Sequence, residues 1–385
     1  MTTFKRFLEP PQGHFFLLGP RGTGKTRWTE QRFPEALRVD LLDPVQLREL
    51  SARPERLRDL VAGNPGRTCV VIDEVQKCPT LLEVVHALIE RDRSKRFVLT
   101  GSSARKLRRE GVNLLGGRAE QRSLHPFMAA ELAGKFHLEA ALRHGLLPVV
   151  WASPNPEGQV RAYNALYLKE EVQAEGLVRN VGGFARFLEA MSFSHAGVLN
   201  LANIARECQI SRTTVEGHLA VLEDLLLGWR LPIFRRRAQR ALAVHPKFYF
   251  FDAGIYRANR PMGPLDSPGE IGGPALEGLV AQHLRAWCAY GGNRSSLYYW
   301  QTRAGTEVDF VVYGPDGCQA VEVKNSATVR PEDLRGLRAW AEDYPGSGRW
   351  LLYRGSDRLE REGVRCLPVQ DFLEELQPGK WPPWE

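Results

Sequence analysis

The chain has 385 residues, of which 43% are hydrophobic and 25% are charged, and this composition excludes a largely disordered protein. Lys and Arg outnumber Asp and Glu by 52 to 45, and the resulting net charge of +7 is too small to establish a polyanionic partner by itself. The length predicts two or three domains, and because no stretch is apolar for long enough to span a bilayer, we expect a cytoplasmic protein.

Residues 1–125 alternate short apolar runs with helical patterns. A helix is predicted at 81–90, where apolar residues recur at helical spacing, and buried strands are predicted at 14–18, 37–42, 68–73 and 96–100. This alternation predicts an α/β fold in which a doubly wound parallel sheet carries helices on both faces.

The sequence GPRGTGKT (19–26) fits the phosphate-loop pattern G-x-x-x-x-G-K-[S/T] and lies between a predicted strand and a helix. Its glycines let successive N–H groups point at phosphate oxygens, so we expect Lys25 to reach the β- and γ-phosphates of ATP and Thr26 to ligate Mg²⁺. The alternative is a chance glycine-rich turn. The predicted nucleotide-binding residues are Gly19, Pro20, Arg21, Gly22, Thr23, Gly24, Lys25, Thr26 and Asp73.

An apolar strand that ends in two carboxylates follows in VVIDEVQ (70–76). Asp73 is expected to hold the magnesium ion and Glu74 to polarise the attacking water. In the alternative interpretation, Asp73 is a helix cap and Glu74 is merely solvated.

Two further residues are candidates for contact with the γ-phosphate. Ser102, in FVLTGSS, either senses this phosphate or caps a following helix. Arg118, in LLGGRAEQ, is a candidate for stabilising transition-state charge in a neighbouring subunit, and the alternative is a solvated basic face.

Taken in this order, GPRGTGKT, VVIDEVQ, TGSS and LLGGR resemble an AAA-type P-loop ATPase. The resemblance implies hydrolysis of ATP with Mg²⁺ at subunit interfaces. It therefore implies a homo-oligomer, commonly a ring, with a hexamer as one arrangement. We place the ATPase core at 1–125 and a helical lid at 126–186.

Residues 187–258 have the order of a winged helix-turn-helix. Helical patterns at 201–207 and 212–227 precede strand-like segments at 229–234 and 247–251, with a basic tip between the two strands. DNA contact and a protein–protein role are both open for such a unit. The candidate DNA-binding residues are Arg212, Thr213, Thr214 and His218 near the start of the second helix, and Arg235, Arg236, Arg237 and Arg240 at the tip.

The proline- and glycine-rich segment 259–275 is expected to be a linker, and 276–385 is expected to be a further α/β domain. Within it, the turn GPDG (314–317) predicts a hairpin in which facing residue numbers sum to 631. Asp309 then faces Glu322, and Glu307 faces Lys324. Strand alternation puts these four on one face, while Val308, Phe310, Val312, Val321 and Val323 point to the other.

Two carboxylates held this close need a proton or a cation between them, and Mg²⁺ or Mn²⁺ suits an oxygen-rich site. Glu322-Val323-Lys324 preceded by Asp309 resembles the PD-(D/E)xK nucleases, most closely the Holliday-junction resolvases. The resemblance implies a restriction-endonuclease-like domain in which Asp309 and Glu322 bind metal, Glu277 assists, and Lys324 orients the attacking water. The alternative is a hydrated hairpin face with a Glu307–Lys324 ion pair.

Together these features predict an ATP-hydrolysing AAA-type motor that acts on branched or duplex DNA, Holliday junctions and repair intermediates included. Its C-terminal domain is expected to bind or cleave DNA. The alternative from a different class is an ATP-dependent regulatory switch, or protein-interaction ATPase, whose nuclease-like domain is inactive.

Overall fold

The computed structural model describes residues 4–103, 115–167, 181–236, 240–264 and 266–384. These residues form an N-terminal unit (Leu8–His125 with Asp224–Leu227) and a C-terminal unit (Met1–Phe7, Pro126–Glu223 and Gly228–Glu385). The regions expected as a lid, a winged helix and a nuclease-like domain therefore share one unit. Among the described residues, no helix combines the length and apolarity needed to cross a membrane.

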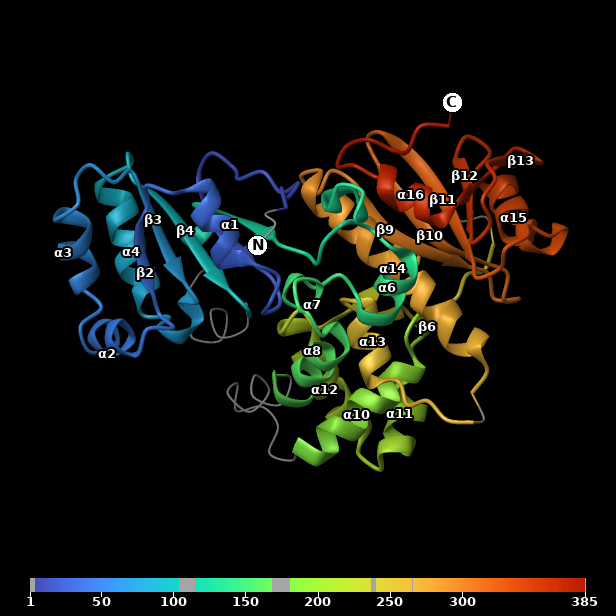
Figure 1. Cartoon of the computed structure of the whole chain (residues 1–385), viewed down its shortest axis with the longest axis horizontal. Coiled ribbons are helices and arrows are strands. Elements are labelled where there is room, and N and C mark those ends of the chain that lie inside the picture. The colour runs from blue at the N-terminus through green and yellow to red at the C-terminus, as the bar shows by residue number, and fades with distance from the viewer. Residues whose placement is uncertain (1–3, 104–114, 168–180, 237–239, 265, 385) are drawn as a thin grey trace. The chain divides into compact units, whose positions relative to one another are not determined.

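A parallel sheet of five strands, in the order β2-β3-β4-β1-β5, forms the centre of the N-terminal unit (Figure 1). The strands are β1 (His14–Leu18), β2 (Leu37–Asp40), β3 (Cys69–Asp73), β4 (Arg96–Gly101) and β5 (Ala119–Ser123). All neighbouring pairs are parallel, which confirms the predicted sheet. The edge strand β5 directly follows Arg118, and its half-exposed sequence AEQRS differs from the buried apolar runs of the inner strands.

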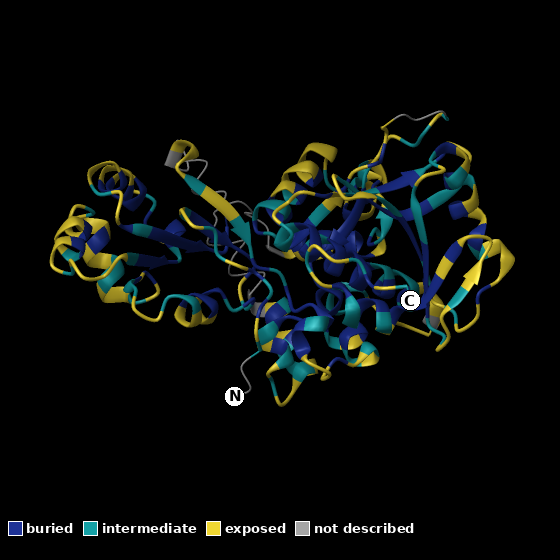
Figure 2. Cartoon of the chain, turned by 90° about the horizontal axis from the view of Figure 1, so that it is seen from above, coloured by how far each residue is buried: buried dark blue, intermediate teal, exposed yellow. Residues whose placement is uncertain are grey.

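Among the described residues of this unit, four α-helices accompany the sheet: α1 (Lys25–Arg32), α2 (Pro44–Ala52), α3 (Arg56–Ala62) and α4 (Leu81–Arg91). Helix α4 buries its apolar stripe, and these side chains join those of β1–β4 in one hydrophobic core. Burying a side chain such as Leu88 or Ile89 stabilises the fold by about 1.5–3 kcal/mol. The inner strands β1, β3 and β4 are largely buried, as the dark blue strands of this unit in Figure 2 show.

A mixed sheet of six strands, ordered β13-β14-β12-β11-β10-β9, forms the largest layer of the C-terminal unit. Its strands are β9 (Ser296–Gln301), β10 (Glu307–Gly314), β11 (Gly317–Lys324), β12 (Gly348–Tyr353), β13 (Leu359–Arg361) and β14 (Val364–Pro368). Helices α14 (Pro268–Tyr290), α15 (Arg335–Asp343) and α16 (Val369–Glu375) pack on it.

The β10–β11 hairpin has the predicted register, since Gly314 pairs with Gly317 and Phe310 with Val321. The predicted division of its faces is wrong in one respect, because the pairing of β10 with β9 shifts by one residue between Val308 and Val311. Such a bulge lets neighbouring odd and even positions share a face. Val308 and Val311 consequently lie in the same core cluster, which does not include Phe310.

The middle of the C-terminal unit is mainly helical. It contains α6 (Leu138–His144), α7 (Pro148–Trp151), α8 (Pro156–Ala162), α10 (Val181–Phe193), α11 (Leu201–Cys208), α12 (Arg212–Asp224) and α13 (Ala253–Asn259). A small antiparallel sheet, ordered β6-β8-β7, accompanies α11 and α12, since β6 precedes these two helices and β7 and β8 follow them. Its strands are β6 (Gly197–Val198), β7 (Gly228–Leu231) and β8 (Lys247–Phe250).

The segment between β7 and β8, expected to be the tip of a wing, pairs with the edge strand β9. The N–H of Phe234 donates to the Tyr299 carbonyl at 2.7 Å, and the N–H of Ala243 donates to the Gln301 carbonyl at 3.0 Å. The described residues of this tip are therefore built into the C-terminal sheet.

The expected linker 259–275 is helical from Pro268 onward. The Ser267 hydroxyl accepts from the N–H of Glu270, while the Glu270 carboxylate accepts from the N–H of Ser267, and this capping box starts α14. Pro268 is tolerated in the first turn, where its missing N–H costs nothing. Burial of Ile271, Leu276 and later apolar residues then outweighs the low helix propensity of the glycines and of Pro274.

Candidate functional site

The phosphate-loop sequence forms a tight loop between β1 and α1. Gly22 and Gly24 have φ values of +81° and +86°, a region that favours glycine. A Cβ atom on Gly19 would lie 2.5 Å from the Leu124 carbonyl oxygen, so this position also requires glycine. The Lys25 ammonium is buried at the base of the loop and donates to the carbonyls of Gly19, at 2.7 Å, and Pro20, at 3.3 Å.

Thr26 and Asp73, the two candidate magnesium ligands, are in contact. The Thr26 hydroxyl donates to Asp73 Oδ2 at 2.6 Å, and the Thr100 hydroxyl donates to the other carboxylate oxygen. Asp73 is 6% exposed at the end of β3, and Thr26 lies in the first turn of α1. A hydroxyl and a carboxylate side by side fit the hard, oxygen-preferring Mg²⁺ ion, which draws further oxygens from water and phosphate.

Glu74 lies beside this pair and has left-handed backbone, with φ of +57°. Non-glycine residues in this region cost roughly 1–3 kcal/mol and are concentrated at functional sites. Its carboxylate is 3.9 Å from the Lys25 ammonium and accepts a hydrogen bond of 3.3 Å from the Ser102 hydroxyl. The structure therefore brings the predicted residues Lys25, Glu74 and Ser102 together.

Gln76 also belongs to this group, although it was not predicted. Its side-chain amide donates to the Glu74 carboxylate and, at 2.9 Å, to the Ser102 hydroxyl. The side chain is 6% exposed, and its Oε1 atom has no hydrogen-bond partner among the described atoms. The available sequence signal was its position two residues after the predicted water-polarising Glu74.

Arg118 is not part of this group within one chain. Its guanidinium pairs with Glu90 of α4, and both side chains are exposed. A role of Arg118 in a neighbouring subunit stays a prediction.

Near the start of α12, the structure separates the predicted DNA-binding residues into two kinds. Arg212, Thr213 and Thr214 are exposed, and Arg212 forms an ion pair of 3.1 Å with Glu216. His218 is half-buried, with its ring 5.2 Å from that of Phe184 and 5.1 Å from that of Phe187, and burial lowers its pKa. The ring of His218 is therefore packed against aromatic side chains.

The basic tip makes contacts with the C-terminal sheet and α15. The Arg236 guanidinium lies over the Tyr313 ring at 4.7 Å, and Arg240 pairs with Glu342 and, at 3.0 Å, with Asp343. Arg235 donates to the Val244 carbonyl at 3.2 Å. Arg237 lies outside the described residues.

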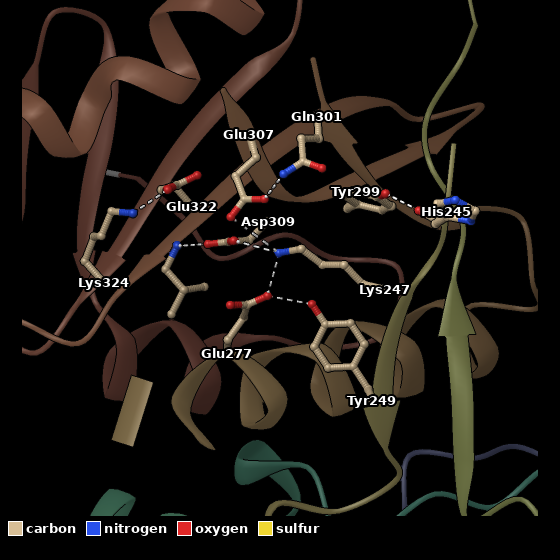
Figure 3. Close-up of polar contacts among 11 residues, drawn as sticks. His245, Lys247, Tyr249, Glu277, Tyr299, Gln301, Glu307, Asp309, Glu322 and Lys324 are labelled. Atoms are coloured by element: carbon tan, nitrogen blue, oxygen red, sulfur yellow. Dashed lines mark hydrogen bonds and ion pairs between the residues drawn. The ribbon is translucent and has the colours of Figure 1, made fainter. Parts of the chain in front are cut away.

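A second group of charged residues lies where β8, α14 and β10 meet (Figure 3). Lys247 of β8 is 2% exposed, and its ammonium lies 3.0 Å from Glu277 Oε1, 3.2 Å from Asp309 Oδ1 and 3.8 Å from Glu307 Oε1. Tyr249, two residues along the same strand, donates to Glu277 at 2.6 Å. We call Lys247, Glu277, Glu307, Asp309 and Glu322 the carboxylate cluster.

Lys324 pairs with Glu322 beside this cluster. Glu322 is 5% exposed, and its Oε2 atom has no hydrogen-bond partner among the described atoms. Asp309 Oδ2 accepts from the N–H of Val323 at 2.9 Å. The three predicted metal ligands therefore do lie in one region, but two of them contact a lysine that the sequence reasoning missed.

Burial and repulsion from neighbouring carboxylates raise the pKa values of the three glutamates in this cluster, Glu277, Glu307 and Glu322. Burial first, and then the neighbouring Asp309, raise the pKa of Glu277 to about 7 and that of Glu322 well above its ordinary value. Burial disfavours the Lys247 ammonium, but the charges of Glu277, Tyr249 and Asp309 outweigh it and raise the pKa of Lys247 well above its usual range.

The cluster does not fit a divalent metal. Among the described residues, no group of three or more His, Cys, Asp or Glu is arranged to hold a metal ion. The ammonium of Lys247 lies between the carboxylates of Glu277 and Asp309, so a metal there would face a like charge. Only the orphaned Oε2 atom of Glu322 points to an additional ligand.

Comparison with known proteins divides the chain into three matched regions. Residues 12–133 match the family model of an AAA domain. This match supports an AAA-type ATPase domain. Residues 135–266 and 272–372 match two domains of unknown function, DUF8612 and DUF4143 respectively.

The chain is 26% identical, over 369 residues, to the uncharacterized proteins Mb2031c of Mycobacterium bovis and Rv2008c of Mycobacterium tuberculosis. Each match covers 93% of this chain and 80% of the relative. Among solved structures, a replication initiator DnaA bound to AMPPCP and single-stranded DNA aligns with 13% identity and a TM-score of 0.27, covering 56% of this chain and 83% of that one. Protein VC1899 from Vibrio cholerae aligns with 12% identity and a TM-score of 0.22, covering 80% and 88%.

Proposed function

We propose that this protein is an oligomeric AAA-type ATPase that hydrolyses ATP and uses its turnover to act on DNA. The observation that supports hydrolysis is the meeting of Lys25, Thr26, Asp73 and Glu74 at one loop. These are the residue types that phosphoryl transfer to water requires, and they lie at the start of α1 and at the end of β3, within the region that matches an AAA domain.

In this proposal each residue has a separate role. The loop N–H groups and Lys25 hold the phosphates, and Thr26 with Asp73 hold the magnesium ion, which neutralises charge on the transferred group when bound. Glu74 accepts a proton from the attacking water, and Ser102 with Gln76 fixes the direction of its carboxylate.

The proposed oligomer assigns Arg118 to the active site of a neighbouring subunit. An Arg118→Ala variant should bind ATP and hydrolyse it slowly. Mixing it with an excess of a Lys25→Ala variant, which cannot hydrolyse ATP but retains Arg118, should restore turnover. No recovery on mixing, in assemblies shown to be mixed, would reject this role.

The proposed DNA contact rests on the exposed start of α12. Arg212, Thr213 and Thr214 are exposed together on a helix that follows a helix and a turn, the arrangement in which residues at a helix start read base edges. Phosphate contacts by Arg212 would make binding weaken as salt rises.

The test is the ATPase rate measured without DNA and with linear, forked and four-way DNA. We expect at least one of these DNAs to raise the rate several-fold, and a variant with alanine at Arg212, Thr213 and Thr214 to lose the increase while keeping its basal rate. Arg161→Ala is the matched control, because Arg161 forms the same type of exposed i,i+4 pair, with Glu157. Rates indifferent to every DNA would reject DNA as the target.

A second candidate is a regulatory ATPase whose helix–turn–helix binds a protein. The observation that favours it is the use of Arg236 and Arg240 in contacts within the chain, which leaves fewer cations for phosphates. If the protein hydrolyses ATP at a rate that none of these DNAs changes, this candidate is favoured over the first.

A further inference from the structure

Lys247, on β8, contacts two elements that follow it at a distance in the sequence, α14 and β10. It begins β8 in the small antiparallel sheet, and its side chain reaches Glu277 on α14 and Asp309 on β10 (Figure 3). Because side chains alternate along a strand, Lys247 and Tyr249 share one face of β8, and both contact Glu277.

All three donors of the Lys247 ammonium have acidic neighbours. The carboxylates of Glu277 and Asp309 lie at hydrogen-bond distance from the ammonium nitrogen, and that of Glu307 lies 3.8 Å from it. The ring of Tyr299 is a further favourable neighbour, with its centroid 5.7 Å from the ammonium nitrogen. An ammonium has three donors and no acceptor. Glu277 and Asp309 accept hydrogen bonds from two of these donors, and Glu307 adds an ion-pair contact.

The second carboxylate oxygens of Asp309 and Glu307 also accept hydrogen bonds from protein groups. Asp309 Oδ2 accepts from the N–H of Val323 at 2.9 Å, and Glu307 Oε2 accepts from the Gln301 side chain at 2.9 Å. A magnesium or manganese site needs about six oxygens arranged around one point. In the cluster, the carboxylate oxygens of Glu277 and Asp309 that face each other are already directed at Lys247.

We propose that Lys247 is a built-in cation that takes the place of a divalent metal between Glu277 and Asp309. The cluster then serves to fasten β8 to α14 and the C-terminal sheet, and the C-terminal domain is not a metal-dependent nuclease. This inference is independent of the proposed ATPase, whose residues lie in the N-terminal unit.

The charge balance of the cluster supports this assignment. Four carboxyl groups (Glu277, Glu307, Asp309 and Glu322) face two ammonium groups, those of Lys247 and Lys324. Without Lys247, the four carboxyl groups would face only the ammonium of Lys324. The same carboxylates without Lys247 would form an acidic pocket, in which the orphaned Oε2 of Glu322 is a further ligand.

The test compares Mn²⁺ binding by the full chain, without nucleotide, using the electron paramagnetic resonance signal of free Mn²⁺. The wild type and Asp309→Asn should bind the same number of ions, because the cluster holds none. Lys247→Met should bind one additional ion, and the double variant Lys247→Met/Asp309→Asn should lose it. Lys324→Met is the matched control, since it removes the other ammonium without opening the space between Glu277 and Asp309. This control should bind no additional Mn²⁺.

Each other outcome overturns the proposal. If the wild type binds one ion more than Asp309→Asn, a metal already occupies the cluster. If a folded Lys247→Met variant binds no additional Mn²⁺, the ammonium does not occupy a metal position. If Lys324→Met binds an additional Mn²⁺, the loss of either ammonium is enough to create a metal site. Should Lys247→Met fail to fold, the comparison between wild type and Asp309→Asn still decides the question. A Mn²⁺-dependent nicking activity that Asp309→Asn removes would also overturn it.

Discussion

The Thr26 hydroxyl donates a hydrogen bond of 2.6 Å to Asp73, which lies 47 residues further along the chain. Thr26 is in the first turn of α1, which follows β1, and Asp73 ends β3, so the bond joins the two candidate magnesium ligands across the carboxyl ends of β1 and β3, between which β4 lies in the sheet. Ligand sites of open parallel sheets lie at this edge.

Substituting the two residues closest to the chemistry should separate binding from hydrolysis. Glu74→Gln should retain ATP affinity within about threefold and lose at least about 100-fold in kcat, because the amide cannot accept the proton of the attacking water. Lys25→Ala should lose ATP binding itself. Calorimetry and steady-state rates distinguish the two, and an undiminished rate in Glu74→Gln would contradict the assignment.

Gln76 should act as a positioning residue for Glu74. Gln76→Ala removes the amide that holds both Glu74 and Ser102, so we expect kcat to fall roughly tenfold while KM for ATP stays unchanged. The surface substitution Gln370→Ala is the control. A change in KM alone would instead assign Gln76 to nucleotide binding.

Gly19 should be intolerant of even one added methyl group. The Cβ of Gly19→Ala would lie 2.5 Å from the backbone oxygen of Leu124, so the loop must shift, and we expect ATP affinity to fall at least about tenfold. At Gly13 an added Cβ has no atom within 4 Å, so Gly13→Ala should bind ATP as the wild type does. Equal affinities in the two variants would contradict the tight packing of the loop.

The stability of the C-terminal unit should fall in mild acid because of His283. Its Nε2 accepts from the N–H of Ala129 at 2.9 Å, so the ring is neutral, and burial lowers its pKa to about 4. The unfolded chain, with a histidine pKa near 6.5, then binds the proton first. The stabilisation is complete above pH 6.5 and is lost as the pH falls toward 4, by roughly 3 kcal/mol in all.

Denaturant unfolding at pH 7.5, 6 and 5 measures this loss. His283→Gln keeps an acceptor but does not titrate, and its stability should therefore depend less steeply on pH over the same range. Parallel pH profiles for the variant and the wild type would rule out His283 as the source.

Removing the Lys247 ammonium should destabilise the C-terminal unit strongly. Lys247→Met leaves buried carboxylates without their cation, a change that typically costs about 3–5 kcal/mol. Adding Asp309→Asn removes part of the repulsion and should recover some of this loss. Thermal and denaturant unfolding of the single and double variants form a double-mutant cycle, and additive losses would show that the two groups do not interact.

The parallel sheet could be predicted because each of its inner strands is a short apolar run. The hairpin register was equally accessible, since the turn GPDG alone fixes which residues face each other. β5 has no such apolar run, because it is a polar edge strand. The start of α14 was also missed, because five glycines and prolines between 268 and 274 hide a helix that burial and a capping box stabilise.

The candidate nucleotide site was largely readable from the sequence, because its residues belong to contiguous motifs. The carboxylate cluster could be predicted only in part. One local turn determines where Asp309 and Glu322 lie relative to each other. Lys247, in contrast, lies 62 residues before Asp309 in the chain, and no local sequence pattern predicts the contact between them. The bulge at Asp309 and Phe310 could not be predicted from the sequence either, because it depends on the pairing of β10 with β9.

The pairing of β9 with the segment after β7 has a consequence for dissecting the protein. A fragment starting at the apparent linker near residue 260 would lack residues 232–243, and the N–H and C=O groups of β9 that they satisfy would become exposed. Uncovered sheet edges recruit other chains, so such a fragment should self-associate when expressed alone. Fragments that begin before Gly228 would keep this edge covered.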